Sequence, residues 1–198
     1  PYRRQRQMCI RDSMNFDELE ESDFDRPLGE STGAGVIFGT TGGVIEAAVR
    51  TAYEIQTKKT LPKLDFTELR GLAGIRSATI DFDGVPVKIG IAHGLGNARR
   101  LVEEIRAGRS PYHAIEIMAC PGGCVGGGGQ PIHDGTEFAE DRGNVLWRLD
   151  QGELLRFSHE NPDVKALYKD YLGAPLGEKS HHLLHTDHNA WQMPQKML

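Results

Sequence analysis

The sequence has few cysteines, no excess of positive charge and no long hydrophobic run. A net charge of -5 offers no basic field for nucleic acid or for an anionic membrane surface. No stretch approaches the roughly 20 apolar residues that a membrane-spanning helix needs. No secretory leader is recognisable, so we expect a cytoplasmic protein. Three cysteines cannot form an even disulfide framework, and under reducing conditions a close pair of thiols indicates a metal or redox site.

The beginning of the chain, residues 1–13, is polar and rich in arginine, and follows neither helical nor strand periodicity. We expect this segment to be non-native sequence, of the kind that a translated sequencing adapter produces, in front of an N-terminally truncated protein. An authentic disordered arm is the alternative. Cys9 falls in this segment and is therefore set apart from the chemistry.

A glycine-rich apolar segment, residues 33–43, predicts a tight turn that leads into a helix. Free N–H groups at such a helix start can bind an anion, but close packing of strand on helix is the favoured interpretation. The sequence lacks the Gly-Lys-Ser/Thr of a phosphate-binding loop. Five apolar residues recur at helical spacing and are expected to form the buried face: Val44, Ile45, Ala48, Val49 and Ala52.

Alternating apolar residues on both sides of Asp83-Gly84 predict a β-hairpin, with Pro86 near the start of a strand at a sheet edge. Asn97 is expected to cap the following helix, and Gly108 to end it. An apolar run from Tyr112 to Met118 then predicts a further strand. Strand, helix and strand in this order imply a right-handed crossover, so we expect an α/β fold with a mostly parallel sheet flanked by helices.

Beyond Asp134, apolar residues at helical spacing predict several short helices that wrap over the α/β part. Asn161-Pro162 has the composition of a helix cap followed by a first helical residue. His181, His185 and His188 would share one face of a helix and could bind a metal there. A polar face packed on the body of the protein is the favoured interpretation of these histidines.

The most informative segment is Met118–Pro131, in which Cys120 and Cys124 lie four positions apart among glycines. Thiolates are the soft ligands of iron–sulfur clusters, and glycines let inorganic atoms approach the main chain. Zinc would need four ligands, and His113 or His133 would have to complete the set. A thiol–disulfide couple normally has two spacer residues, not three. We therefore favour a cluster over both alternatives.

Glu116 interrupts the apolar run just before the cysteines. The sequence leaves open whether this carboxylate pairs with a backbone group, a lysine or a proton carrier.

The segment Glu116–Pro131 resembles the third cluster-binding motif of the iron-only ([FeFe]) hydrogenases. Gly35–Ala48 resembles the glycine segment that lines the cofactor pocket of that family, and Gly94–Arg99 is similar to the entry of its crossover helix. Ser158–Pro162 and His181–Thr186 resemble the family's small-subunit region, here fused to the rest.

This resemblance covers about residues 24 to 188. It implies that residues 14–133 are the C-terminal part of the large-subunit catalytic domain, and that residues 134–198 are a small-subunit-like helical region.

The cofactor that the resemblance implies is the H-cluster, a [4Fe–4S] cubane joined through a cysteine sulfur to a diiron subcluster bearing CO and cyanide. Cys120 would ligate the cubane, and Cys124 would bridge the cubane and the diiron unit. The residues that would border the diiron unit are Gly35, Phe38, Gly39 and Met118.

The implied activity is the reversible reduction of protons to H2, with electrons from ferredoxin or from NAD(P)H through partner subunits, after maturation proteins have inserted the cofactor. The alternative is a hydrogenase-like assembly factor for cytosolic iron–sulfur proteins. Gln130-Pro131 and the small-subunit-like tail favour the hydrogenase. The family's first two cluster motifs do not occur in this sequence, so we expect the chain alone to hold no complete cofactor and to be inactive.

Overall fold

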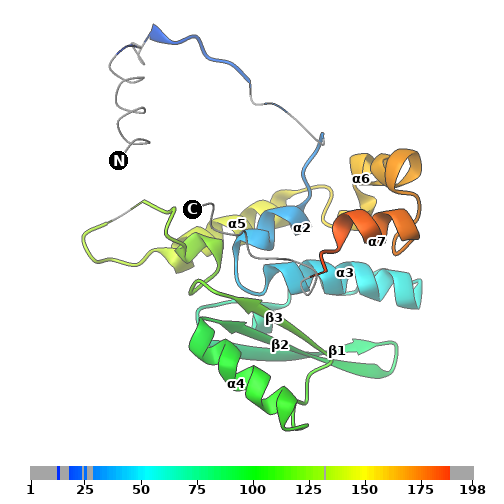
Figure 1. The fold of residues 1–198 in the computed structure, drawn as a ribbon. Helices are drawn as coiled ribbons and strands as arrows, with labels where there is room; N and C mark the ends of the chain where they lie inside the picture. The colour runs from blue at the N-terminus through cyan, green and yellow to red at the C-terminus, as the bar shows by residue number, and fades with distance from the viewer. Residues whose placement is uncertain (1–12, 14–17, 24, 26–28, 132, 188–198) are drawn as a thin grey trace, which may run out of the picture.

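A small β-sheet with helices on both sides forms the body of the protein (Figure 1). The computed structural model describes residues 13, 18–23, 25, 29–131 and 133–187. The main elements are α2 (Gly33–Val36), α3 (Gly43–Thr57), β1 (Ile75–Phe82), β2 (Val85–His93), α4 (Leu95–Arg106), β3 (Ala114–Met118), α5 (Ala139–Gly152), α6 (Pro162–Leu167) and α7 (Glu178–Leu184). Short turns of 3-10 helix include Ile37–Gly39, Thr67–Leu69, Cys124–Gly126 and Ser158–Glu160, and a π-helical turn spans Tyr168–Leu172. Within these described ranges, no helix combines the length and apolarity that crossing a membrane would take.

The sheet has the strand order β1-β2-β3, with β2 in the centre. β1 and β2 form an antiparallel hairpin, whose turn residues Asp83 and Gly84 both have positive φ angles, 58° and 90°, as a tight two-residue hairpin turn requires. β2 and β3 pair in parallel. The predicted α/β class is confirmed, although one of the two strand pairings is antiparallel, so the sheet is mixed.

Pro86 lies at an edge, as predicted, although β2 is the central strand. It pairs with Asp81 of β1, whereas β3 joins β2 only from Ile89 onward. The missing N–H of proline therefore falls where β2 has a neighbour on one side only.

Helix α3 covers one face of the sheet and α4 covers the other (Figure 1). The core lies mainly between the sheet and α3. Its buried members are Ile45, Val49, Tyr53, Leu61, Phe66, Leu69, Ile80, Ile89, Ile91 and Phe157. Phe157 comes from the C-terminal region, so this region shares the core of the α/β part, as the prediction of a wrap requires.

The buried face of α3 differs from the predicted one. Three of the five residues expected inside are exposed: Val44, Ala48 and Ala52. Ile45 and Val49 are buried as predicted, but Glu46 and Arg50 share their face and are fully buried. Apolar periodicity could not reveal this face because two of its members carry charges that are compensated only in the folded protein.

The prediction that Asn97 caps α4 is wrong. α4 begins at Leu95 after Gly94, and Asn97 lies within its first turn, where its side-chain amide donates to the carbonyl of His93 at 2.9 Å. Gly108 does follow the helix end with a positive φ of 65°, a conformation that glycine adopts without strain.

Helix α6 begins as predicted at Asn161-Pro162, with Asn161 as its cap. The side-chain oxygen of Asn161 accepts hydrogen bonds from the backbone N–H of Asp163 at 2.8 Å and of Val164 at 3.2 Å. Its amide also donates to the carbonyl of Glu30 at 2.8 Å, which fastens the start of α6 to the segment before α2.

The rings of His181 and His185 stack at 4.6 Å between centroids. His188, the third member of the predicted face, lies outside the described residues, as does Cys9 with residues 1–12.

Candidate metal centre

The two cysteines lie on a loop that follows β3 directly, at the carboxyl end of the parallel strand pair. This is the edge of an α/β sheet where ligands usually bind. Cys120 and Cys124 are free thiols and both are exposed. Between them, Gly122 and Gly123 have positive φ angles of 80° and 92°, which fold the loop back so that Cys124 begins a short 3-10 turn.

The loop packs against the backbone of the segment Gly39–Thr41. The N–H of Thr41 donates to the carbonyl of Gly122 at 2.9 Å. A Cβ atom at Gly123 would lie 2.7 Å from the nitrogen of Thr41 and 2.9 Å from the oxygen of Gly39, so only glycine fits there. Gly39, predicted to border the cofactor, therefore contacts the cysteine loop.

The other residues predicted to border the cofactor have different surroundings. Met118 is half-buried at the end of β3, and its carbonyl accepts a hydrogen bond from Gly94 at 2.9 Å. The backbone N–H of Gly35 donates at 3.1 Å to the hydroxyl of Thr32, the residue that caps α2. Phe38 is 45% exposed and lines an open apolar groove along α3. Of the residues predicted to border the cofactor, Gly39 thus contacts the cysteine loop directly, whereas the side chain of Phe38 lies on the surface.

Glu116, whose partner the sequence could not identify, binds backbone amides at the start of α3. Its two carboxylate oxygens accept from Gly42 at 2.5 Å and from Ile45 at 2.8 Å, and the residue is buried. A negative charge is favourable at a helix N-terminus, where N–H groups lack partners. Glu116 thereby ties the end of β3 to α3, immediately before the cysteine loop.

The loop leaves space on the side of its thiols. A Cβ atom at Gly128 or Gly129 would meet no atom within 4 Å, and one at Gly127 would lie 3.8 Å from the sulfur of Cys120. Two exposed soft ligands beside bare main chain fit an inorganic cluster that is larger than a single ion. The donor set present would supply half of the four thiolates that a [4Fe–4S] cubane needs.

A zinc site receives no support from the histidines considered for it. The ring of His133 packs against Phe138 at 4.6 Å, and Nδ1 of His113 accepts from the N–H of Lys88 at 2.9 Å. Within the described part of the chain, no histidine or carboxylate joins the two cysteines in a group of three possible ligands.

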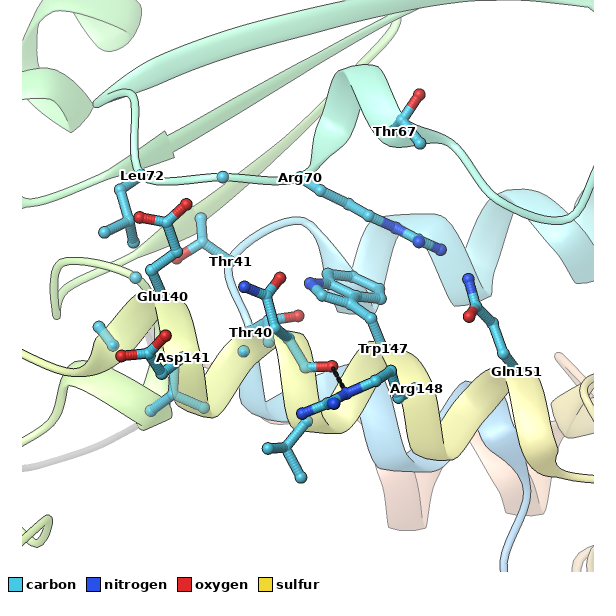
Figure 2. A pocket seen from close by; sticks show the side chains of 17 residues that line it. Thr40, Thr41, Thr67, Arg70, Leu72, Glu140, Asp141, Trp147, Arg148 and Gln151 are labelled. Atoms are coloured by element: carbon cyan, nitrogen blue, oxygen red, sulfur yellow. Dashed lines mark hydrogen bonds between the residues drawn. The ribbon is translucent and has the colours of Figure 1, made fainter.

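A pocket of about 670 Å³ lies next to the loop, between it, the segment 67–72 and α5 (Figure 2). Gly122 and Val125 of the loop form part of its wall. The guanidinium of Arg70 stacks over the ring of Trp147 at 4.1 Å, as Figure 2 shows. The hydroxyl of Thr41 is buried in the wall and has no hydrogen-bond partner among the described residues, so it is available to a polar group that enters.

Six charged side chains form an ion network beside this pocket, of which Glu46, Arg50 and Asp150 are fully buried and Asp65, Arg70 and Arg156 partly exposed. At its centre, Arg50 donates to both oxygens of Asp150 at 2.8 Å, and both side chains are fully buried. Arg50 lies on α3 and Asp150 on α5, so the network joins the α/β part to the C-terminal helices. Its three carboxylates lie within 4.8 Å of one another, but the three guanidinium groups bind them, so they form no cation site.

The arginines hold two of the carboxylates in their charged form. Burial alone would raise the pKa of Asp150, but hydrogen bonds from Arg50 and Arg156 outweigh it and keep this pKa below the ordinary value. The pKa of Asp65 is lowered in the same way by Arg70 and Arg156 against the effect of burial. Burial raises the pKa of Glu46, although Arg70 and Arg50 limit the rise.

These pKa directions predict how stability depends on pH. A carboxyl whose pKa is depressed in the folded state stabilises the protein above its unfolded pKa of about 3.9, and loses this contribution as pH falls toward the folded pKa. The raised pKa of Glu46 has the opposite sign. We therefore expect the free energy of unfolding to fall below about pH 4, and Asp150→Asn to flatten this fall. Urea denaturation between pH 7 and pH 3 measures both; an equal acid dependence in the variant would contradict the role of Asp150.

Two family models together match most of the chain. Residues 4–128 match the model described as "Iron only hydrogenase large subunit, C-terminal domain", and residues 136–191 match "Iron hydrogenase small subunit".

Curated relatives and solved structures agree with these matches. The chain is 55% identical over 175 residues to the NADP-reducing hydrogenase subunit HndD of Solidesulfovibrio fructosivorans, covering 88% of this chain and 30% of that one. It is 47% identical over 135 residues to the periplasmic [Fe] hydrogenase large subunit of Nitratidesulfovibrio vulgaris, covering 68% of this chain and 32% of that one. A variant of the [FeFe]-hydrogenase HydA1 from Chlamydomonas reinhardtii superposes with a TM-score of 0.67 at 42% identity, over 91% of this chain and 52% of that one.

Proteins of a second kind are also similar. The cytosolic iron-sulfur assembly component 3 of Mus musculus is 31% identical over 164 residues, covering 81% of this chain and 33% of that one. The chain thus spans about a third of the length of the curated relatives it matches.

Proposed function

Because this chain belongs to the iron-only hydrogenase family, we propose that Cys120 and Cys124 are two ligands of an H-cluster. The observation that carries the proposal is the pair of free, exposed thiols on a glycine loop at the carboxyl end of the parallel strands. In this assignment Cys120 would be a ligand of the [4Fe–4S] cubane, and Cys124 would be the ligand shared by the cubane and the diiron unit. The function is then the interconversion of protons and electrons with H2.

The residues of this chain bind and orient the cofactor, whose irons supply the redox chemistry when it is bound. Gly123 lets the cysteine loop approach the backbone of Gly39 and Thr41 closely, and we propose that this contact holds the thiols toward the cofactor. Glu116 fixes the strand end that leads into the loop. Gly35, Phe38 and Met118 are proposed to border the diiron unit and to limit the access of water to it.

The activity of a whole enzyme is part of this proposal, since the relatives extend well beyond the matched region. The remaining cubane ligands would come from family motifs that this sequence does not contain. We propose NAD(P)H-linked subunits or ferredoxin as electron partners, because one relative is described as a subunit of an NADP-reducing hydrogenase. Maturation proteins and a cytoplasmic location belong to the same proposal, although another relative is described as periplasmic.

The second candidate is an iron–sulfur assembly factor, a function that the similarity to the mouse protein supports. The hydrogenase is preferred because identity to the hydrogenase relative is much higher and because a small-subunit model also matches. In the structure, the side-chain amide of Gln130 donates to the carbonyl of Cys124 at 3.1 Å, so Gln130 helps to hold the cysteine loop.

Anaerobic reconstitution tests the proposal. A polypeptide that carries this sequence together with the family's upstream cysteine motifs is matured without air, and its iron, its infrared spectrum and H2 evolution are measured. We expect iron uptake, CO and cyanide bands, and H2. A protein that takes up no iron would show that the cluster assignment is wrong, whereas iron without CO bands or H2 would favour the assembly factor.

A further inference from the structure

The second half of the cysteine loop is held from outside by one side chain of α5. Nη1 of Arg142 donates to the carbonyl of Val125 at 3.0 Å, and Nη2 donates to the carbonyl of Pro131 at 3.3 Å. These two carbonyls bracket the glycine run that follows Cys124. Glu137 lies 3.7 Å from the same guanidinium but is largely exposed, so it competes weakly for it.

This half of the loop has little else to order it. Residues 126–129 are all glycine, and glycine loses more conformational freedom on folding than any other residue. Its backbone bonds are local: Gly126 donates to Gly123, Gly127 to Cys124 and Gln130 to Gly127, at 3.0 to 3.1 Å. A hydrogen bond from a charged donor is stronger than these neutral ones, and Arg142 makes two.

We propose that Arg142 is a positioning residue that fixes the loop at Cys124 from the C-terminal helical region. The region that matches the small-subunit model would then take part in shaping the cluster site. The consequence for iron rests on the proposed function, whereas the ordering of the loop does not depend on it.

Arg148 provides a matched control on the same helix. Its Nε donates to the carbonyl of Asn144 within α5 at 3.3 Å, and Figure 2 shows this contact at the pocket wall. It is an exposed arginine with no described bond to the loop.

Hydrogen exchange of this chain in the metal-free state tests the ordering. In Arg142→Ala we expect the amides of Gly126, Gly127 and Gln130 to exchange about tenfold faster, which corresponds to about 1.4 kcal/mol. Arg148→Ala should leave them unchanged, and amides in the β2–β3 ladder should keep their protection in both variants. Unchanged protection of the loop in Arg142→Ala, or an equal loss in the ladder, would overturn the proposal.

Arg142→Lys keeps the charge but cannot bridge two carbonyls with a planar fork, so an intermediate effect is expected. If Arg142→Ala does not fold, the exchange of the loop amides in Arg142→Lys tests the proposal in its place. In the reconstituted polypeptide, Arg142→Ala should also release iron to a chelator several-fold faster than Arg148→Ala. A wild type that takes up no iron would refute the proposed function and leave the exchange result standing.

Discussion

Cys124→Ser is expected to remove the infrared bands of CO and cyanide and to reduce H2 evolution to background in the matured polypeptide. The bridging role implied by the family resemblance requires a thiolate at this position, and a serine hydroxyl is a poor ligand for iron–sulfur chemistry. The backbone of the loop does not depend on the sulfur, because the turn at Cys124 is held through its carbonyl by Gly127 and Gln130. The loss should therefore be chemical and not a consequence of unfolding.

Two control measurements separate the loss of a ligand from a loss of folding. The metal-free Cys124→Ser protein should unfold at the same temperature as the wild type, since Cys124 is exposed. Cys9→Ser, at the remaining cysteine of the sequence, should retain both the bands and the turnover. Bands and H2 evolution that persist in Cys124→Ser would remove this residue from the bridging role.

The place of the cysteine pair, on a loop directly after a strand, could be predicted from the sequence because its signal is local. The spacing of Cys120 and Cys124, the glycines around them and the preceding strand all lie within one short segment. The support of the loop could not be predicted in this way. Thr41 reaches it from a segment far earlier in the sequence, and Arg142 reaches it from the next helix, α5. The amide of Thr41 and the guanidinium of Arg142 both donate to backbone carbonyls, which leave no trace in the pattern of residue types.

Much of the fold was also accessible from local patterns. The hairpin around Asp83-Gly84 and the cap at Asn161 depend on neighbours in the sequence, and both are confirmed. The prediction for Asn97 is wrong because this good capping residue lies within the first turn of α4, whose cap is Gly94. The sequence marks Glu116 as unusual, but its partners are backbone amides at the start of α3, which only the tertiary structure brings to it.

The buried face of α3 shows the same limit most clearly. Glu46 and Arg50 are one turn apart and would usually form a surface pair. Here the pair is buried because Asp150 and Arg156 arrive from the C-terminal region, about a hundred residues later. Burial of a charged pair requires that its partners be complete, and a helical periodicity of apolar residues carries no information about them.

Arg50→Met is expected to lower the free energy of unfolding by about 3–5 kcal/mol, a large part of the roughly 5–15 kcal/mol of an ordinary domain. Methionine fills a similar volume, so the loss comes chiefly from Asp150, which would remain buried without its bidentate partner. Urea denaturation at pH 7 measures the change. Lys59→Met is the control, because the bond of Lys59 to Asp83 is short, 2.6 Å, but both side chains are more than half exposed. No measurable loss is expected there, and equal losses in the two variants would contradict the importance of burial.

Arg50→Met also tests whether the ion network supports the cysteine loop. Asp150 and Arg142 lie on the same helix, α5, so a network that no longer holds one end of α5 should weaken the grip of Arg142 on Val125 and Pro131. We therefore expect Arg50→Met to speed the exchange of the loop amides as well as to lower global stability, whereas Arg142→Ala changes the loop alone. Combining the two variants measures their coupling, since residues that act through one rigid element show non-additive effects. Additive effects on loop exchange would mean that α5 does not transmit the loss from the network to the loop.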